Sequence, residues 1–180
     1  MNLSLSERSV FVERDGARYH IRISGQGSPL MLLHGFTGSC KSWAHLSKTL
    51  STTHTVICPD LLGHGNTTSP QAAARYNITA VAAAIMAVLD SLNVERTALH
   101  GYSMGGRLAL YAAMNYPSRI ETLSLESASP GLKTVDEQIA RTQSDDALAR
   151  TIDAKGIPYF VDYWERVPLF ETQSRLAPET

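Results

Sequence analysis

The sequence contains one serine whose neighbours would make its hydroxyl a reactive group. Residues 101–105 read Gly-Tyr-Ser-Met-Gly, between a short apolar run at 97–100 and a long alanine-rich segment. Such a turn between a strand and a helix lifts a serine hydroxyl above a sheet, where it can take part in nucleophilic or base chemistry. Ser103 is therefore the candidate catalytic residue. The backbone N–H of Met104, at a helix N-terminus, is a candidate oxyanion-hole donor.

Two other interpretations compete for this stretch. The five-residue pattern also occurs by chance in loops. The glycine spacing of a phosphate-binding loop is present too, but that motif continues with Lys and then Ser or Thr, whereas this chain has Arg107 and Leu108. The phosphate-loop interpretation fails at both chemical positions, so the serine turn is favoured.

A second glycine-rich loop would supply the other oxyanion donor. Residues 30–33 form a continuous apolar run, typical of a strand covered on both faces, and residues 34–38 then read His-Gly-Phe-Thr-Gly. In sheets of this kind a backbone N–H from such a loop faces the serine, so Phe36 is the second candidate donor. His34 is interpreted as a packing residue and not as the catalytic base. His64, in a further glycine-rich loop, is likewise interpreted as structural, because no partner ligands stand at metal-site spacing.

The elements that must position these residues alternate along the chain. A hairpin is indicated at Val10–Ile23, where Asp15-Gly16 separates two alternating segments. Later strand patterns alternate with helical ones, which predicts an α/β protein with a mostly parallel sheet and right-handed crossovers. The strand patterns are 30–33, 55–58, 97–100 and 121–126, and the helical patterns are 42–50, 77–92 and 104–116. Ligands bind beyond the carboxyl ends of such strands.

The character of the chain changes after Pro130. The segment from about Leu132 has helical and aromatic patterns but no strand pattern. We therefore expect residues 1–130 to form the N-terminal part of a sheet core and residues 131–180 to form part of a helical cap.

Composition excludes several classes of function. Sixteen basic and seventeen acidic residues give a net charge of −1, which argues against a general nucleic-acid or membrane-surface binder. The apolar run 80–89 is too short to span a bilayer, and the N-terminus lacks the apolar core of a signal peptide. Cys40 and Cys58 match no metal-ligand spacing and are expected to be reduced thiols. We expect a cytoplasmic protein without a metal or cofactor; the sequence does not specify its oligomeric state.

The motifs together resemble the α/β-hydrolase superfamily. In chain order they are the His-Gly-Phe loop at 34–38, the Asp-x-x-Gly-His-Gly loop at 60–65 and the serine turn at 101–107. A narrower similarity is to the family of 2-succinyl-6-hydroxy-2,4-cyclohexadiene-1-carboxylate synthases of menaquinone biosynthesis. It is carried by Leu-Glu-Ser-Ala-Ser-Pro-Gly-Leu at 125–132 and by Asp-Tyr-Trp-Glu-x-x-Pro-Leu-Phe at 162–170. The resemblance covers the chain from about Val10 onward.

This resemblance implies a lyase. The family eliminates pyruvate from 2-succinyl-5-enolpyruvyl-6-hydroxy-3-cyclohexene-1-carboxylate, and its serine abstracts a ring proton. Ser103 matches that serine, and Phe36 and Met104 match the oxyanion-hole donors. Matches to substrate-binding positions are Tyr102, Arg107, Arg141 and Trp164, the arginines suiting a small-molecule carboxylate substrate. A carboxylesterase or carbon–carbon hydrolase on the same scaffold and an inactive fragment with a binding role remain as alternatives.

The catalytic histidine and aspartate of the family have no counterpart here. The six histidines fall in the predicted hairpin, in the first helix, at a strand entry, in the glycine loops and in the strand before Ser103. Glu126 matches the acid position of some superfamily members, but an acid still requires its histidine. A serine is a poor base or nucleophile without an adjacent imidazole. The expectation is that these residues belong to a longer enzyme and that the chain alone is inactive.

Overall fold

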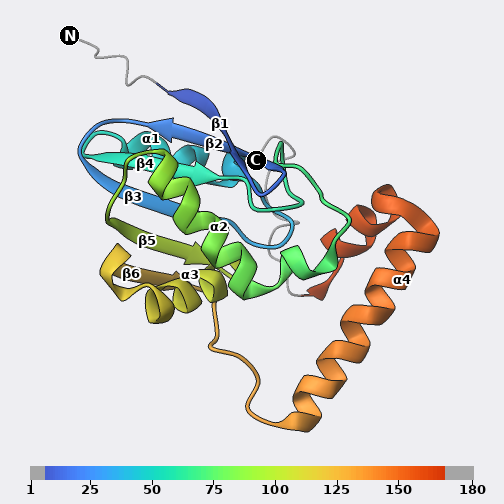
Figure 1. Cartoon of the computed structure of the whole chain (residues 1–180). Coiled ribbons are helices and arrows are strands. Elements are labelled where there is room, and N and C mark those ends of the chain that lie inside the picture. Colours follow the sequence, from blue (N-terminus) through green and yellow to red (C-terminus); the bar gives the residue numbers. More distant parts are fainter. Residues whose placement is uncertain (1–6, 169–180) are drawn as a thin grey trace. The chain divides into compact units, whose positions relative to one another are not determined.

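Six strands of the described residues, 7–168, form one sheet in the computed structural model (Figure 1). The sheet order is β1-β2-β4-β3-β5-β6; β1 to β2 and β2 to β4 are antiparallel, and the remaining neighbours are parallel. This confirms the predicted α/β fold with a mostly parallel sheet. The strands are β1 Arg8–Arg14, β2 Ala17–Ser24, β3 Ser28–Leu33, β4 His54–Pro59, β5 Thr97–Tyr102 and β6 Ile120–Glu126.

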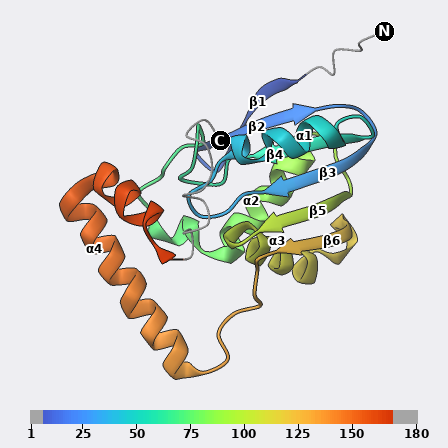
Figure 2. The same ribbon diagram turned by 180° about the vertical axis from the view of Figure 1, so that it is seen from behind.

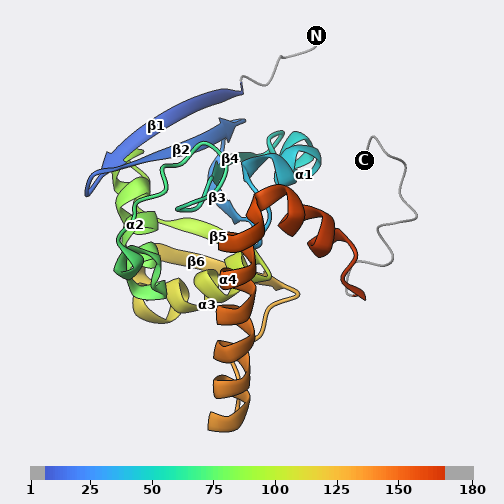
Figure 3. The same ribbon diagram turned by 90° about the vertical axis from the view of Figure 1, so that its right-hand side faces the viewer.

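Helices cover both faces of this sheet. Helices α2 and α3 lie on one face, and α1 lies on the opposite face, as Figures 2 and 3 show. The helical elements of the first unit are α1 Ala44–Leu50, α2 Ile78–Ser91 and α3 Met104–Asn115, with short 3₁₀ turns at Cys40–Trp43, Ala73–Tyr76 and Pro117–Arg119. The N-cap of α2 is Asn77, whose side-chain oxygen accepts a hydrogen bond from the backbone N–H of Ala80 at 2.8 Å.

Successive residues of a strand point to opposite faces, so one strand contributes to two cores. In β3, Met31 and Leu33 belong to the large core under α2 and α3, whereas Leu32 belongs to a smaller core on the α1 face. The smaller core contains Trp43 and the two cysteines, Cys40 and Cys58, which are free and buried. Continuous apolar runs such as residues 30–33 therefore reflect burial on both faces.

The helix predicted at 42–50 differs from expectation at its start. It begins as a 3₁₀ turn whose N-cap Ser39 accepts from the backbone N–H of Lys41 at 3.2 Å, and the α-helix follows from Ala44. Leu46, inside the predicted helix, is 37% exposed, whereas Trp43 of the 3₁₀ turn is buried. Contacts of residues 40–50 with the smaller core come from Cys40 and Trp43 in the 3₁₀ turn and from Leu50 at the end of α1.

The chain divides into two compact units, residues 1–130 and residues 131–180. Within the second unit, α4 spans Val135–Glu165 and is interrupted at Gly156, whose φ of 79° is outside the helical region. A capping box between Thr134 and Glu137 starts this helix. Leu169 and Phe170 of the motif at 162–170 lie outside the described residues. No helix within residues 7–168 is long and apolar enough to cross a membrane.

The start of α3 lies against the end of β3 at a distance that only glycine allows. A Cβ added to Gly105 would lie 2.3 Å from the carbonyl oxygen of Leu33 and 2.5 Å from that of His34. Both obstacles are backbone atoms, which cannot move aside as a flexible side chain would. Gly105 therefore sets the separation between α3 and the carboxyl end of β3.

We predict that Gly105→Ala destabilises the fold by about 3 kcal/mol or more, because the clash can be relieved only by separating α3 from β3. The matched control is Gly16→Ala. Gly16 has a positive φ of +72°, and an added Cβ there meets nothing within 4 Å. Its cost should be the backbone strain alone, about 1 kcal/mol. Urea denaturation followed by circular dichroism measures both; equal losses for the two variants would contradict the close approach.

Candidate active site

Ser103 occupies a strained backbone conformation between β5 and α3. Its φ is 52° and its ψ is −113°, although it carries a side chain. Such a conformation is rare for residues other than glycine and persists only where surrounding structure holds it. The backbone N–H of Ser103 donates to the carbonyl oxygen of Glu126 at 2.9 Å, and its carbonyl accepts from the N–H of Arg107 at 3.1 Å. Strand β6 and the first turn of α3 thus hold the serine turn from both sides.

The loop at 34–38 lies directly against this turn. A Cβ added to Gly35 would lie 2.9 Å from the ring of Tyr102 and 3.5 Å from the Cβ of Ser103. A hydrogen bond of 3.0 Å from the N–H of Gly38 to the carbonyl of Gly35 closes the loop. The glycine thus brings the backbone that precedes Phe36 next to the serine.

The two candidate oxyanion donors come from elements that adjoin at Ser103. Phe36 follows Gly35 in the loop, and Met104 is the first residue of α3. The N–H groups in the first turn of an α-helix have no acceptor within the helix. The bond from Arg107 to Ser103 is the first of this helix, so the N–H of Met104 has no acceptor inside α3. Both candidate donors thus come from backbone that adjoins Ser103, and their role as an oxyanion hole stays a prediction.

His34 supports this loop from below. It is fully buried; its Nδ1 lies 2.8 Å from the carbonyl oxygen of Gly35, and its Nε2 accepts from the N–H of Leu61 at 3.0 Å. Because Nε2 accepts, the neutral ring carries its proton on Nδ1 and donates it to Gly35. Burial lowers the pKa of His34, with the neighbouring His64 acting in the same direction. Both ring nitrogens have backbone partners, so the ring braces the loop.

His64 connects the loop at 60–65 to the candidate oxyanion loop. Its Nε2 hydrogen-bonds the carbonyl oxygen of Phe36, and its Nδ1 lies 3.0 Å from the carbonyl oxygen of Leu62. The ring also lies edge-on to the ring of Phe36, with centroids 6.3 Å apart. His64 thereby fixes the orientation of the peptide that follows the candidate donor.

The structure adds an imidazole–carboxylate pair that sequence reasoning missed. His100 on β5 lies 3.5 Å from a carboxylate oxygen of Glu126 on β6, measured from Nε2, and its Nδ1 lies 3.0 Å from Ser124 Oγ. The parallel register places His100 opposite Ser124, so the alternation of the two strands brings these side chains to one face. Finding this pair requires the register between β5 and β6, because His100 and Glu126 belong to no common sequence motif.

The predicted substrate-binding residues fall into two groups. Tyr102 is half-buried beside the loop glycine, and Arg107 is exposed on the first turn of α3, its Nη2 lying 3.5 Å from Ser129 Oγ. Arg141 and Trp164 belong to the second unit. There Arg141 pairs with Asp145 at 2.8 Å, and the Trp164 ring lies 5.4 Å from that of Phe160. The first unit therefore brings Ser103, both candidate donors, Tyr102 and Arg107 to one end of the sheet, while the roles of Arg141 and Trp164 stay predictions.

The lowered pKa of His34 predicts a pH dependence of stability. Its folded pKa lies below its ordinary value of 6.5, so its contribution is complete above about pH 6.5 and decreases as the pH falls through that value. Chemical denaturation between pH 5 and 8 should show this loss in the wild type and a smaller loss in His34→Gln, whose amide oxygen still accepts from Leu61. His34→Leu, which leaves that buried N–H unpaired, should cost about 1–3 kcal/mol more than His34→Gln. Identical pH profiles for all three proteins would contradict this role.

Comparison with known proteins agrees with this geometry. Residues 28–178 match the family model described as alpha/beta hydrolase fold. A Bacillus subtilis protein provisionally named 2-succinyl-6-hydroxy-2,4-cyclohexadiene-1-carboxylate synthase is 43% identical over 92% of this chain and 61% of its own length. The structure of MenH from S. aureus has a TM-score of 0.80 and 34% identity, covering 95% of this chain and 61% of that one.

A relative named for a different reaction matches less of the chain. The crystal structure of Epoxide Hydrolase A from Mycobacterium thermoresistibile has a TM-score of 0.63 and 32% identity, and it covers 67% of this chain and 39% of its own. The present chain thus spans about three fifths of the length of the two synthase-like proteins, at 61% of each. Fold, serine turn and sequence agree: the chain belongs to the α/β-hydrolase fold family.

Proposed function

We propose that this chain carries the serine and oxyanion donors of a lyase that eliminates pyruvate from 2-succinyl-5-enolpyruvyl-6-hydroxy-3-cyclohexene-1-carboxylate, a step of menaquinone biosynthesis. The observation that carries the proposal is the extent of the similarity to MenH from S. aureus, which covers 95% of the chain. The match to Epoxide Hydrolase A covers 67%. A match of 95% must include most of residues 131–180, where members of one fold family with different reactions can differ.

The chemistry of this elimination fits a serine beside two backbone donors. The ring proton next to the succinyl ketone is acidified by that ketone, and Ser103 Oγ removes it. The electron pair moves onto the ketone oxygen, where the N–H groups of Phe36 and Met104 stabilise the negative charge. Return of the pair shifts the ring double bond and breaks the bond between the ring and the enolpyruvyl oxygen. Enolpyruvate leaves, takes up a proton and becomes pyruvate, so atoms and electrons balance.

Arg107 suits a substrate with several carboxylates. Among residues 7–168 it forms no ion pair, and its neighbour Ser129 is neutral. An arginine whose charge is not already neutralised can bind a carboxylate through two parallel hydrogen bonds. Its backbone N–H also donates to the carbonyl of Ser103, which fixes the Arg107 side chain one helical turn from the serine.

The proton acceptor for Ser103 is not apparent among the six histidines. His20 is paired with Asp60 in a buried network, and His34 and His64 support the loops. His100 contacts Glu126 and Ser124, and His54 contacts Thr53. His45 lies on α1, on the face of the sheet opposite α3 (Figure 3). We therefore propose that the imidazole comes from sequence corresponding to the part of the relatives that this chain does not match, and that the chain alone is inactive.

The first test measures pyruvate release, coupled to lactate dehydrogenase, from the cyclohexene substrate. The 180-residue chain alone should show no release above background. The same chain fused to the C-terminal part of the Bacillus subtilis relative that it does not match should release pyruvate. Ser103→Ala in the fusion should lower kcat by about 1,000-fold or more. Full activity of that variant would contradict the role of Ser103.

Two alternatives give different results in the same fusion. Cleavage of simple esters with a burst of acyl-enzyme, without pyruvate release, would favour a hydrolase. Failure of a fluorophosphonate to label Ser103 in the folded fusion would favour an inactive binding module. Each of these results would overturn the lyase assignment.

A second test concerns Arg107. In the active fusion, Arg107→Gln should raise KM by about tenfold or more, since it removes a charge-assisted contact to a carboxylate, and Arg107→Lys should restore part of it. The control is Arg96→Gln, a charge-neutralising change in the segment before β5. An Arg107→Gln enzyme with unchanged KM would show that this arginine does not bind substrate.

A further inference from the structure

A buried cluster of three potential metal ligands lies on the α1 face of the sheet, apart from Ser103. Among residues 7–168 it is the one group of its kind: His20 from β2, Cys40 from the 3₁₀ turn and Asp60 after β4, with one ligand atom of each within 4.8 Å of the others. All three residues are buried, with 5%, 2% and 1% exposure respectively. Imidazole nitrogen, thiolate and carboxylate oxygen are the three donor types that zinc uses in proteins.

Two of the three spacings between the donor atoms are near those of a tetrahedral zinc site. His20 Nδ1 lies 2.9 Å from Asp60 Oδ2 and 3.8 Å from Cys40 Sγ. Ordinary zinc bond lengths give about 3.4 Å between nitrogen and oxygen ligands and about 3.5 Å between nitrogen and sulfur. To accept the ion, the first pair must therefore move apart and the second pair together, each by roughly half an ångström or less. The third pair, Cys40 Sγ and an Asp60 carboxylate oxygen, lies within 4.8 Å.

The surrounding hydrogen bonds can adapt to an ion. Without one, His20 Nδ1 donates to Asp60 and Nε2 faces Ser9 Oγ at 3.2 Å. An ion on Nδ1 requires the proton to sit on Nε2, and the hydroxyl of Ser9 can accept that proton as readily as it can donate its own. The backbone N–H groups of Cys40 and Asn66 hold the Asp60 carboxylate at 2.6 and 2.8 Å. The site thus has the outer hydrogen-bond partners that orient metal ligands.

A divalent ion suits the charges that this donor set presents once it is bound. With Cys40 as a thiolate, the cluster holds a thiolate and the Asp60 carboxylate side by side, and a divalent ion neutralises both. The ion takes the place of the thiol proton, which binding releases.

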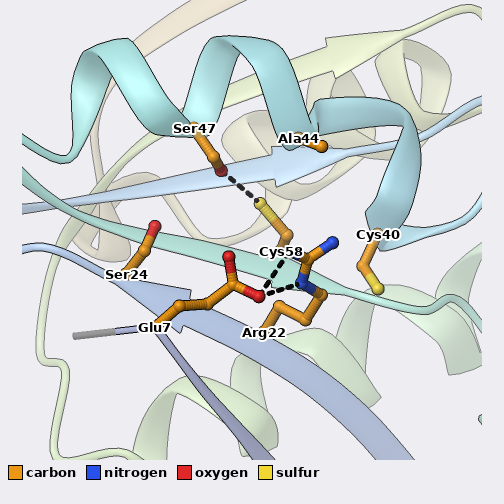
Figure 4. Close-up of a pocket in the computed structure, with 7 residues that line it drawn as sticks. All are labelled: Glu7, Arg22, Ser24, Cys40, Ala44, Ser47 and Cys58. Carbon is orange, nitrogen blue, oxygen red and sulfur yellow. Dashed lines mark hydrogen bonds and ion pairs between the residues drawn. The ribbon is translucent and has the colours of Figure 1, made fainter. Parts of the chain in front are cut away.

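A small cavity provides room beside the cluster. It is lined by Cys40 together with Glu7, Arg22, Ser24, Ala44, Ser47 and Cys58 (Figure 4). The Arg22 guanidinium binds the Glu7 carboxylate, with Nε at 2.9 Å, so its charge is already neutralised. Cys58 Sγ faces Ser47 Oγ at 3.4 Å. The cavity thus reaches Cys40, whereas neither His20 nor Asp60 lines it.

We propose that His20 Nδ1, Cys40 Sγ and Asp60 Oδ2 together bind one divalent transition-metal ion of the zinc class, with water as the fourth ligand. The site is structural. Asp60 begins the loop at 60–65, and this loop makes two of the contacts that hold the candidate oxyanion loop, from Leu61 to His34 and from His64 to Phe36. An ion bound to Asp60 would therefore restrict the motion of the loop at 60–65, and through it that of the candidate oxyanion loop.

The test uses the full 180-residue chain, freed of metal with a chelator. Titration with Co²⁺ should give one equivalent bound, with the thiolate charge-transfer absorption that a cysteine ligand produces. Zn²⁺ should displace the cobalt and raise the thermal midpoint of unfolding.

Cys40→Ser should abolish the charge-transfer band and weaken Zn²⁺ binding by about 100-fold or more. The matched control is Cys58→Ser, which removes the other thiol of the same cavity and should leave the spectrum unchanged. Circular dichroism in the presence of chelator checks that both variants fold. If one variant does not fold, the cobalt charge-transfer spectrum of the wild type still tests the proposal. Absence of the charge-transfer band in the wild type, or its loss in Cys58→Ser with retention in Cys40→Ser, would overturn the proposal.

Discussion

The separation of α3 from the carboxyl end of β3 is the constraint on which the candidate site depends. Gly105 leaves no room for a side chain against the carbonyl oxygens of Leu33 and His34. Because β3 runs directly into the loop that holds Phe36, this contact fixes that loop relative to the first turn of α3. The strained backbone of Ser103 lies between the two and is held by Glu126 on the next strand. Two backbone donors and a hydroxyl therefore come from three segments with little freedom to move apart.

The loop at 60–65 supports the candidate oxyanion loop at 34–38. At its start, the Asp60 carboxylate accepts hydrogen bonds from the backbone N–H groups of Cys40 and Asn66 and from the ring of His20. Burial raises the pKa of this carboxyl, but these hydrogen bonds outweigh burial and leave it below its ordinary value. Two hydrogen bonds then connect the loop at 60–65 to the loop at 34–38, one from Leu61 to His34 and one between His64 and Phe36. The histidines of the glycine loops thus support the backbone around the candidate donor Phe36.

Much of this could be predicted from the sequence because the signals are local. The serine turn, the loop before Phe36 and the alternating strands and helices each depend on residues close together in the chain. The cluster of His20, Cys40 and Asp60 could not be found in this way, since its members are twenty residues apart and meet only through the pairing of β2 with β4. The same holds for His100 and Glu126, which depend on the register of β5 and β6. Periodicity in the segment 42–50 does not show which of its apolar residues reach the core, and Leu46 lies exposed.

We propose that the N–H groups of Phe36 and Met104 face one oxygen bound at Ser103. Amide NMR tests this on the fusion with the C-terminal part of the Bacillus subtilis relative, labelled with ¹⁵N at phenylalanine and methionine, before and after a fluorophosphonate reacts with Ser103. We expect downfield proton shifts for Phe36 and Met104, because both donate to the phosphonyl oxygen. We expect little change for Phe11 and Met114, which are exposed on β1 and on α3. Unchanged amide shifts of Phe36 and Met104 in the modified protein would contradict it.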